Sequence, residues 1–149
     1  MISATPSCPR GWTSYGGSCY VIIQKYLDWF EGKIACETVG GSLAEIETAG
    51  ENKFLTDLLN RGKGGFASSA APTIPRMWIG LYDFIVELDF VWVSTRYEPD
   101  VTHWASGEPN NNGDEDCGEL EYTGFWNDED CERKIWTACE MELRHEIYY

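Results

Sequence analysis

The chain has 149 residues, which is the usual size of one domain and long enough to bury a hydrophobic core. Its composition, with 43% hydrophobic and 14% aromatic residues, excludes a disordered acidic chain. Eleven Lys and Arg residues stand against 25 Asp and Glu residues, and the net charge of −14 argues against a nucleic-acid partner held through phosphate contacts.

The first residues predict a short extension followed by a hairpin. Residues 1–7 are too polar for a signal peptide, so we expect them to be the start of a mature chain, with Met1 an added residue. Two β-type runs then flank the turn at residues 15–17, with Cys8 and Cys19 near their ends, which predicts a hairpin. The chain contains no apolar run of the ~20 residues that a membrane-spanning helix needs.

Two helices are predicted next. The first, over residues 28–38, begins with the capping-box pair Asp28 and Glu31 and stops before two glycines. The second, over residues 48–60, begins with a similar pair and carries an apolar stripe of Phe and Leu residues. Both start signals are local, so we expect these helices whatever the rest of the fold is.

The remainder of the chain predicts short strands separated by loops. Residues 61–75 are rich in Gly, Ala, Ser and Pro and predict a surface loop, and residues 97–113 predict a second, longer irregular loop. Short strands are expected over residues 77–81, 90–94, 124–126 and 134–138. The class is therefore α+β, with two helices early in the chain and then mainly antiparallel strands around one large loop.

The cysteines predict three disulfides. There are six of them, Cys8, Cys19, Cys36, Cys117, Cys131 and Cys139, and none shows the close spacing of a zinc site. An even number without metal spacing favours disulfides and a secreted or cell-surface environment. The spacing alone leaves their pairing open.

The negative charge is concentrated in residues 97–132. This segment holds 12 of the 25 acidic residues and no Lys or Arg. A folded domain tolerates such a concentration if the carboxylates are spread in solvent or neutralised by cations. Both interpretations, a solvated acidic loop and a cation site, remain open at this point.

Acidic and amide side chains form four clusters in and near this segment. They are Asp83 with Glu87, Glu108 with Asn110 and Asn111, Glu115 with Asp116, and Asn127 with Asp128. Carboxylate and amide oxygens without thiolate or imidazole suit Ca²⁺, which takes about 6–8 oxygen ligands. The spacing is not that of an EF-hand loop. Each pair taken singly is equally typical of a solvated acidic surface.

An ordered series of short motifs resembles the C-type lectin domain family. The motifs are Cys8-Pro-x-Gly-Trp, Cys19-Tyr, Cys36, Gly41-Ser-Leu-Ala-Glu-Ile46, Trp78-Ile-Gly80, Trp104, Glu108-Pro-Asn110, Glu115-Asp-Cys117, Trp126-Asn-Asp128, Cys131 and Cys139-Glu. The resemblance implies a carbohydrate-recognition domain over residues 8–140, a C-terminal tail over residues 141–149, and a fold of two helices, antiparallel sheets and a long calcium-binding loop. It also implies the disulfides Cys8–Cys19, Cys36–Cys139 and Cys117–Cys131.

The resemblance also assigns candidate ligands for one or two calcium ions. A primary, sugar-binding site falls on Glu108, Asn110, Glu115, Asn127 and Asp128. A second, structural site falls on Asp83, Glu87, Asn111, Glu115 and Asp116. The family's cis proline falls on Pro109, a position at which a tight ligand loop can enforce the cis form.

The resulting hypothesis is a secreted, non-enzymatic lectin. Adjacent sugar hydroxyls would bind Ca²⁺ directly, and the Glu-Pro-Asn order implies the mannose-type sugars mannose, fucose and N-acetylglucosamine. Weak single sites imply a homo-oligomer for avidity. Galactose-type binding despite this motif, and a binding module for mineral or ice surfaces, are the alternatives. A glycosidase with paired carboxylates is disfavoured, because a carboxylate that ligates a metal makes a poor general acid.

Overall fold

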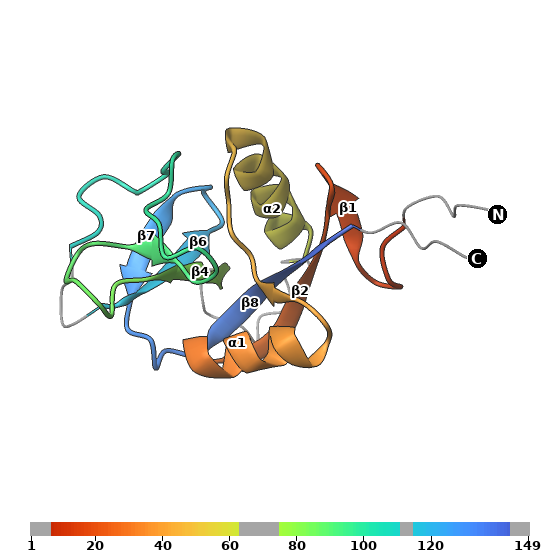
Figure 1. Ribbon diagram of the computed structural model, residues 1–149, viewed down its shortest axis with the longest axis horizontal. Helices are drawn as coiled ribbons and strands as arrows, with labels where there is room; N and C mark the ends of the chain where they lie inside the picture. Colours follow the sequence, from red (N-terminus) through yellow and green to blue (C-terminus); the bar gives the residue numbers. More distant parts are fainter. Residues whose placement is uncertain (1–6, 63–74, 111–114, 144–149) are drawn as a thin grey trace.

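The computed structural model describes residues 7–62, 75–110 and 115–143. The helices and strands in these ranges are α1 (Trp29–Thr38), α2 (Ala49–Gly62), β1 (Thr13–Tyr15), β2 (Ser18–Leu27), β3 (Ser42–Leu43), β4 (Arg76–Tyr82), β5 (Val91–Trp92), β6 (Cys117–Glu121), β7 (Trp126–Glu129) and β8 (Ile135–Glu142). The strands form one sheet in the order β1-β2-β8-β4-β6-β7, with β3 paired to β8 and β5 to β4 (Figure 1). The expected α+β class with two helices is confirmed.

The N-terminal hairpin forms where the sequence predicts it. Gly16 and Gly17 have φ angles of 56° and 89°, the two positive values that a tight type I′ turn between twisted strands requires. The following strand, β2, pairs antiparallel with β8, the last strand of the chain. β8 continues to Glu142, two residues into the expected tail, and the Leu143 N–H donates to Gly17 O.

Helix α1 begins with the predicted capping box and packs against β8. The Glu31 N–H donates to Asp28 Oδ1 at 2.7 Å, and the Glu31 carboxylate accepts from the Asp28 N–H at 2.9 Å. The helix lies close to the strand because Gly32 has no side chain, since a Cβ there would stand 2.5 Å from Thr137 Oγ1. Cys36 joins α1 to the same strand through a disulfide.

The two helices cover opposite faces of the sheet. Side chains alternate between the faces along β4, so Met77 packs in one buried cluster with Leu55 and Leu59 of α2, whereas Trp78 packs in another with Trp29 of α1. Figure 1 shows the helices on either side of β8. No helix among the described residues is long and apolar enough to cross a membrane.

Three features of the second half of the sheet differ from the sequence predictions. β4 and β8 pair in parallel, so the sheet is mixed. The strand expected over residues 124–126 begins at Trp126, because residues 122–125 form the turn that joins it to β6. The sequence does not predict β6 (Cys117–Glu121), because two of its five residues are acidic and it lacks the hydrophobic pattern of a buried strand. The loop predicted over residues 61–75 lies mostly outside the described residues.

The three disulfides pair as the resemblance implies. They are Cys8–Cys19, Cys36–Cys139 and Cys117–Cys131, and no described cysteine is free. The last of them closes the β6–β7 hairpin, which carries two of the candidate calcium ligands. This disulfide-closed hairpin belongs to the acidic segment 97–132, and its strand β6 pairs with β4.

Candidate calcium-binding site

The long irregular segment after β5 is anchored to the start of β7. The Trp126 N–H donates to His103 O at 2.7 Å, and the Ala105 N–H donates to Trp126 O at 2.8 Å. Between these bonds the half-buried Trp104 ring packs edge-on against Trp126, with ring centroids 5.6 Å apart. The chain that leads to Glu108 therefore starts beside β7.

Hydrogen bonds bring Glu108, Asn110 and Asp128 together. The Asn110 N–H donates to Asp128 Oδ1 at 3.1 Å, and Asn110 Nδ2 donates to Glu108 Oε2 at 3.2 Å. The Glu108–Pro109 peptide bond is cis. We call the five residues that the resemblance assigns to the first site the primary cluster, namely Glu108, Asn110, Glu115, Asn127 and Asp128.

The electrostatics of the primary cluster favour a bound cation. Burial, followed by the negative charges of Asp128 and Glu115, raises the pKa of Glu108 to about 7. Its Oε1 atom is buried and receives no hydrogen bond from any donor in the described residues. Asp128 is fully buried. Carboxylates held together in this way repel one another unless a cation lies between them.

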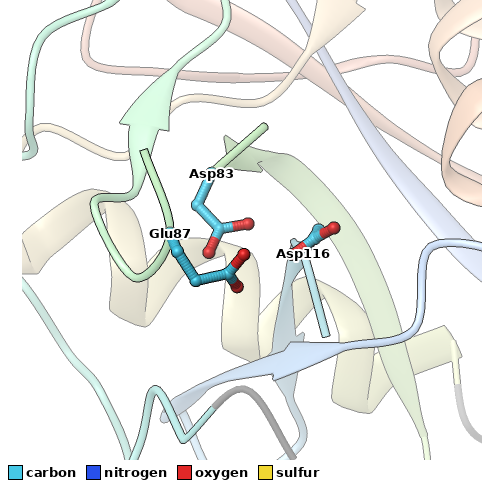
Figure 2. Close-up of side chains that lie close together, drawn as sticks. All are labelled: Asp83, Glu87 and Asp116. Atoms are coloured by element: carbon cyan, nitrogen blue, oxygen red, sulfur yellow. The ribbon is translucent and has the colours of Figure 1, made fainter. Parts of the chain in front are cut away.

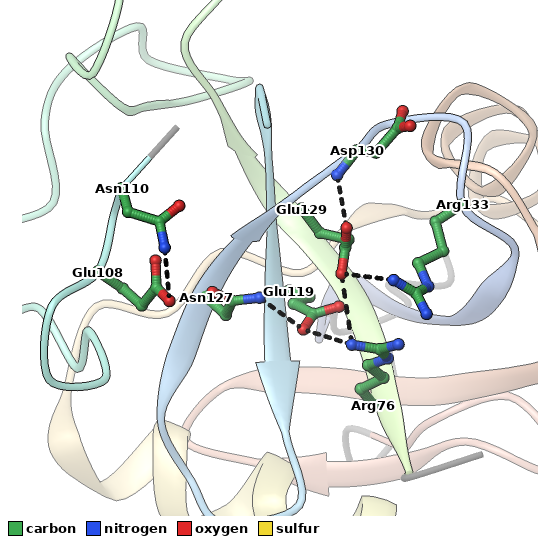
Figure 3. Close-up of polar contacts among 8 residues, drawn as sticks. All are labelled: Arg76, Glu108, Asn110, Glu119, Asn127, Glu129, Asp130 and Arg133. Carbon is green, nitrogen blue, oxygen red and sulfur yellow. Dashed lines mark hydrogen bonds and ion pairs between the residues drawn. The ribbon is translucent and has the colours of Figure 1, made fainter. Parts of the chain in front are cut away.

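Asn127 joins the primary cluster from the other side. It lies on β7 directly opposite Glu119 of β6, and its Nδ2 donates to Glu119 Oε2 at 3.1 Å. In Figure 3, Glu108 and Asn110 lie on the side of Asn127 that is away from Glu119. All five members of the primary cluster are among the described residues, and hydrogen bonds join three of them, Glu108, Asn110 and Asp128.

A second acidic cluster lies at the C-terminal end of β4. Asp83, Glu87 and Asp116 each offer one oxygen such that all three oxygens lie within 4.8 Å of one another (Figure 2). The Asp83 N–H donates to Asp116 O, which fixes the two segments side by side. Of the two other residues expected here, Glu115 precedes Asp116 in the chain and Asn111 lies outside the described residues. We call Asp83, Glu87 and Asp116 the second cluster.

The second cluster also contains carboxylate oxygens without donors. Asp83 Oδ1 and Asp116 Oδ1 are buried and receive no hydrogen bond within the described ranges. Burial raises the pKa of Asp83 to about 7, and Asp116 and Glu87 add to this, although a hydrogen bond from the Leu88 N–H acts in the opposite direction. Leu88 has a φ of 67°, so the loop holds a residue in the left-handed region at this site.

A buried charged network lies between β4, β6 and β7. Arg76 Nη1 contacts Glu119 Oε2 at 3.3 Å and Glu129 Oε2 at 3.4 Å, and Arg133 Nη1 contacts Glu129 Oε2 at 3.2 Å (Figure 3). Burial raises the pKa of Glu119 to about 7, while Arg76 lowers it. No motif in the sequence predicts a role for Glu119 or Glu129. One pattern in the sequence could have indicated a strand here: the residues from Cys117 to Glu121 alternate in polarity, with Glu119 between the uncharged Gly118 and Leu120.

The residues present fit calcium better than a transition metal. Every candidate ligand in both clusters offers a carboxylate or amide oxygen, and three of the carboxylate oxygens are buried without a donor in the part of the chain that the structure describes. The primary cluster combines three carboxylates with two amides, so its side-chain charge exceeds that of one Ca²⁺ by about one. The second cluster, in which three acidic side chains bring one oxygen each within 4.8 Å of one another, can hold a hard divalent cation.

Comparisons with known proteins place the chain in one family. The family model described as "Lectin C-type domain" matches residues 25–141. Lectin BRA-3 of Megabalanus rosa is 33% identical over 96% of this chain and 84% of its own length. CD209 antigen-like protein D of Mus musculus is 36% identical over 89% of this chain, which spans about half (52%) of that protein.

A solved structure supports the same relationship. The cow C-type carbohydrate-recognition domain of CD23 superposes with a TM-score of 0.78 at 27% identity, covering 93% of this chain and 98% of that domain. Both the fold and the family are those of non-enzymatic carbohydrate-binding domains, which confirms that a glycosidase was rightly disfavoured. The chain therefore belongs to the C-type lectin family.

Proposed function

We propose that the protein binds glycans in a calcium-dependent manner through the primary cluster. One observation carries this proposal: Glu108, Asn110 and Asp128 converge by hydrogen bonds of 3.1 and 3.2 Å while a buried oxygen of Glu108 lacks any donor within the described residues. Burial raises the pKa of Glu108 most, and the charges of Asp128 and Glu115 add to this, so a cation at this place would offset the cost of ionising Glu108. Calcium is the ion that suits an all-oxygen set of ligands.

The side chains of the primary cluster can match two neighbouring hydroxyl groups of a sugar. When bound, the calcium ion offers coordination positions that hydroxyl oxygens can fill. Glu108 can accept a hydroxyl hydrogen, because an ionised carboxylate only accepts, and the amide of Asn110 can donate to a hydroxyl oxygen. Each hydroxyl is then paired as both donor and acceptor, and no covalent bond changes.

We infer a preference for mannose-type sugars from the order of acid and amide around Pro109. Glu108 places the acceptor before the proline and Asn110 places the donor after it, so a sugar with the opposite hydroxyl geometry would leave polar groups unpaired. The related CD23 domain was crystallised in the presence of a GlcNAc2Man3 oligosaccharide, which supports this choice. The expected ligands are terminal mannose, fucose or N-acetylglucosamine on glycans and glycoproteins.

We further propose a structural calcium ion at the second cluster. Asp83, Glu87 and Asp116 supply its side-chain oxygens, with Asn111 and Glu115 as further ligands. This ion would fix the turn after β4 against the start of β6. The residue pair Glu115 and Asp116 would then connect the two ions through one peptide unit.

The three disulfides support a location outside the cell, where such bonds persist. We propose a secreted protein that gains avidity as a homo-oligomer, because single shallow sugar sites bind weakly. Sedimentation of the intact chain at several concentrations tests the oligomer, and one monomeric species throughout would contradict it.

Binding to immobilised mannose, with and without a chelator, tests the main proposal. Asp128→Asn is expected to abolish binding, because it removes a buried ligand charge, whereas Asp130→Asn makes the same change at an exposed position two residues away and is expected to bind normally. Binding by the parent protein that survives calcium removal would refute the mechanism. Equal inhibition by free mannose and free galactose would refute the preference.

A further inference from the structure

Glu119 and Asn127 form a directly opposed pair across the β6–β7 ladder. The register aligns the two residues, and Asn127 Nδ2 donates to Glu119 Oε2 at 3.1 Å. Glu119 is completely buried, so water does not compete for this contact. A cross-strand hydrogen bond of this kind involves one member of the primary cluster and one residue outside it.

The chemistry of the pair determines which way the Asn127 amide faces. Asn127 Nδ2 is the donor of the hydrogen bond to Glu119 Oε2, so the NH₂ end of the amide points toward Glu119. The carbonyl oxygen is then at the other end of the same planar group. Figure 3 shows this end on the side where Glu108 and Asn110 lie. An amide turned by 180° would present its NH₂ group to a cation and could not ligate it.

Glu119 is held in place by a positively charged partner. Arg76 Nη1 contacts the same Oε2 atom at 3.3 Å, and Arg76 is itself held by Glu129 at 3.4 Å. The Arg76 side chain is 16% exposed and Glu119 is 0% exposed, so the contact is shielded from solvent. Glu129 also contacts Arg133. The network spans three strands and leaves Glu119 little freedom to turn away from Asn127.

We propose that Glu119 is a positioning residue, supported by Arg76, which orients the Asn127 amide so that its carbonyl oxygen faces the primary calcium site. This inference rests on the function proposed above and adds to it a residue that touches neither the ion nor the sugar. Mutation of a residue that orients a metal ligand typically lowers metal affinity by roughly 10- to 100-fold. The orientation exists before any ion binds, so it can be measured in the metal-free protein.

The first experiment measures calcium affinity by titration calorimetry without sugar. Glu119→Met is expected to weaken binding at the primary site by roughly 10- to 100-fold, because the amide of Asn127 is then free to turn. Glu119→Gln keeps an acceptor oxygen and is expected to lose less. Glu121→Met is the matched control, since it makes the same change two residues along β6 and is expected to bind calcium like the parent. Equal affinity of the parent and Glu119→Met overturns the inference.

A second experiment, in an Asn127→Asp variant, shows whether Glu119 affects calcium affinity by orienting the Asn127 amide or only by stabilising the fold. In an Asn127→Asp variant both ends of the side chain are oxygens, so nothing needs to be oriented. Adding Glu119→Met to that variant is expected to leave calcium affinity unchanged or to raise it, because a repelling carboxylate has gone. A structural role for Glu119 predicts the same loss in both backgrounds, and this outcome would overturn the inference.

NMR of the metal-free parent protein covers the case in which Glu119→Met does not fold. The Asn127 side-chain amide signals, assigned through their loss in Asn127→Asp, are expected to be shifted downfield and protected from exchange. Unshifted and unprotected signals overturn the inference. If the parent binds no calcium in calorimetry, the proposed function fails, while these amide signals still report separately whether Glu119 orients Asn127.

Discussion

The indole Nε1 of Trp126 donates a buried hydrogen bond of 2.8 Å to Asn52 Oδ1. The same Asn52 side chain donates from Nδ2 to Gly124 O, also at 2.8 Å. One side chain of α2 thus holds both the turn between β6 and β7 and the first residue of β7. Helix α2 therefore helps to position β7, the strand that carries Asn127 and Asp128.

Replacing Asn52 by Leu is expected to destabilise the metal-free protein. The change leaves the buried Trp126 N–H and the Gly124 carbonyl without partners, which costs about 1–3 kcal/mol for each group that stays buried and unpaired. Asn60→Leu is the control, because the hydrogen bond that Asn60 Nδ2 donates to Tyr122 O is exposed. Urea unfolding of both variants measures the difference. A smaller loss for Asn52→Leu than for Asn60→Leu would contradict this account.

The stability of the metal-free protein is expected to fall as pH rises toward neutrality. The pKa values of Glu108 and Asp83 are raised to about 7, above the unfolded values near ~4, so the folded protein binds more protons between these values. Stability contributed by these groups is complete below the unfolded pKa and is lost as pH rises through about 7. Thermal unfolding in a chelator, from about pH 5 to about pH 8, tests this sign.

Glu108→Gln isolates the contribution of one group to that pH dependence. The variant cannot ionise at this position, so we expect its stability to equal that of the parent below about pH 4 and to exceed it increasingly as pH rises to about 7. Calcium affinity of the parent should show the opposite trend and weaken below about pH 7, because protons compete with the ion for the ligands. An unfolding difference that is constant with pH would refute the assignment.

Exchanging the acid and the amide around Pro109 is expected to change the sugar preference. Glu108→Gln combined with Asn110→Asp exchanges the acceptor and donor positions and keeps the number of charges, so the double variant should favour galactose over mannose. Inhibition of glycan binding by the two free sugars measures the ratio. Each single variant is the control, and an unchanged ratio in the double variant would show that other residues determine specificity.

Removing one charge from the second cluster is expected to remove one ion. Asp83→Asn keeps the oxygen that accepts from the Leu88 N–H but loses a ligand charge, so calorimetry should show one calcium fewer than in the parent. Asp89→Asn makes the same change outside the cluster and should keep the parent stoichiometry. If both variants bind as many ions as the parent, Asp83 is not a calcium ligand.

Local signals in the sequence predicted the helices and the first hairpin correctly. The capping box at Asp28 and Glu31 and the turn at Gly16 and Gly17 depend on residues within four positions of each other, so they can be read without the fold. The parallel pairing of β4 with β8 could not be predicted in this way. It joins residues that are about 60 positions apart, and the hydrophobic pattern of a short buried strand does not encode its direction.

The candidate ligands were easier to find than the residues that support them. Glu108 and Asp128 occur in motifs that resemble those of a family, whereas Glu119 looked like one acid among many in a polar stretch. Its burial depends on Arg76, which is 43 residues earlier in the chain. A buried charge is visible only when its partner has been placed, because an unpaired one would be too costly to bury.

Glu115 is a candidate ligand of both calcium sites, its neighbour Asp116 is a candidate ligand of the second site, and the Asp83 N–H donates to the backbone oxygen of Asp116. Fixing either residue restricts the other, so the entropy cost of ordering this segment falls mainly on whichever ion arrives first. Calcium uptake should therefore be cooperative. Sugar binding would then switch on over a narrower range of calcium concentration than a single independent site permits.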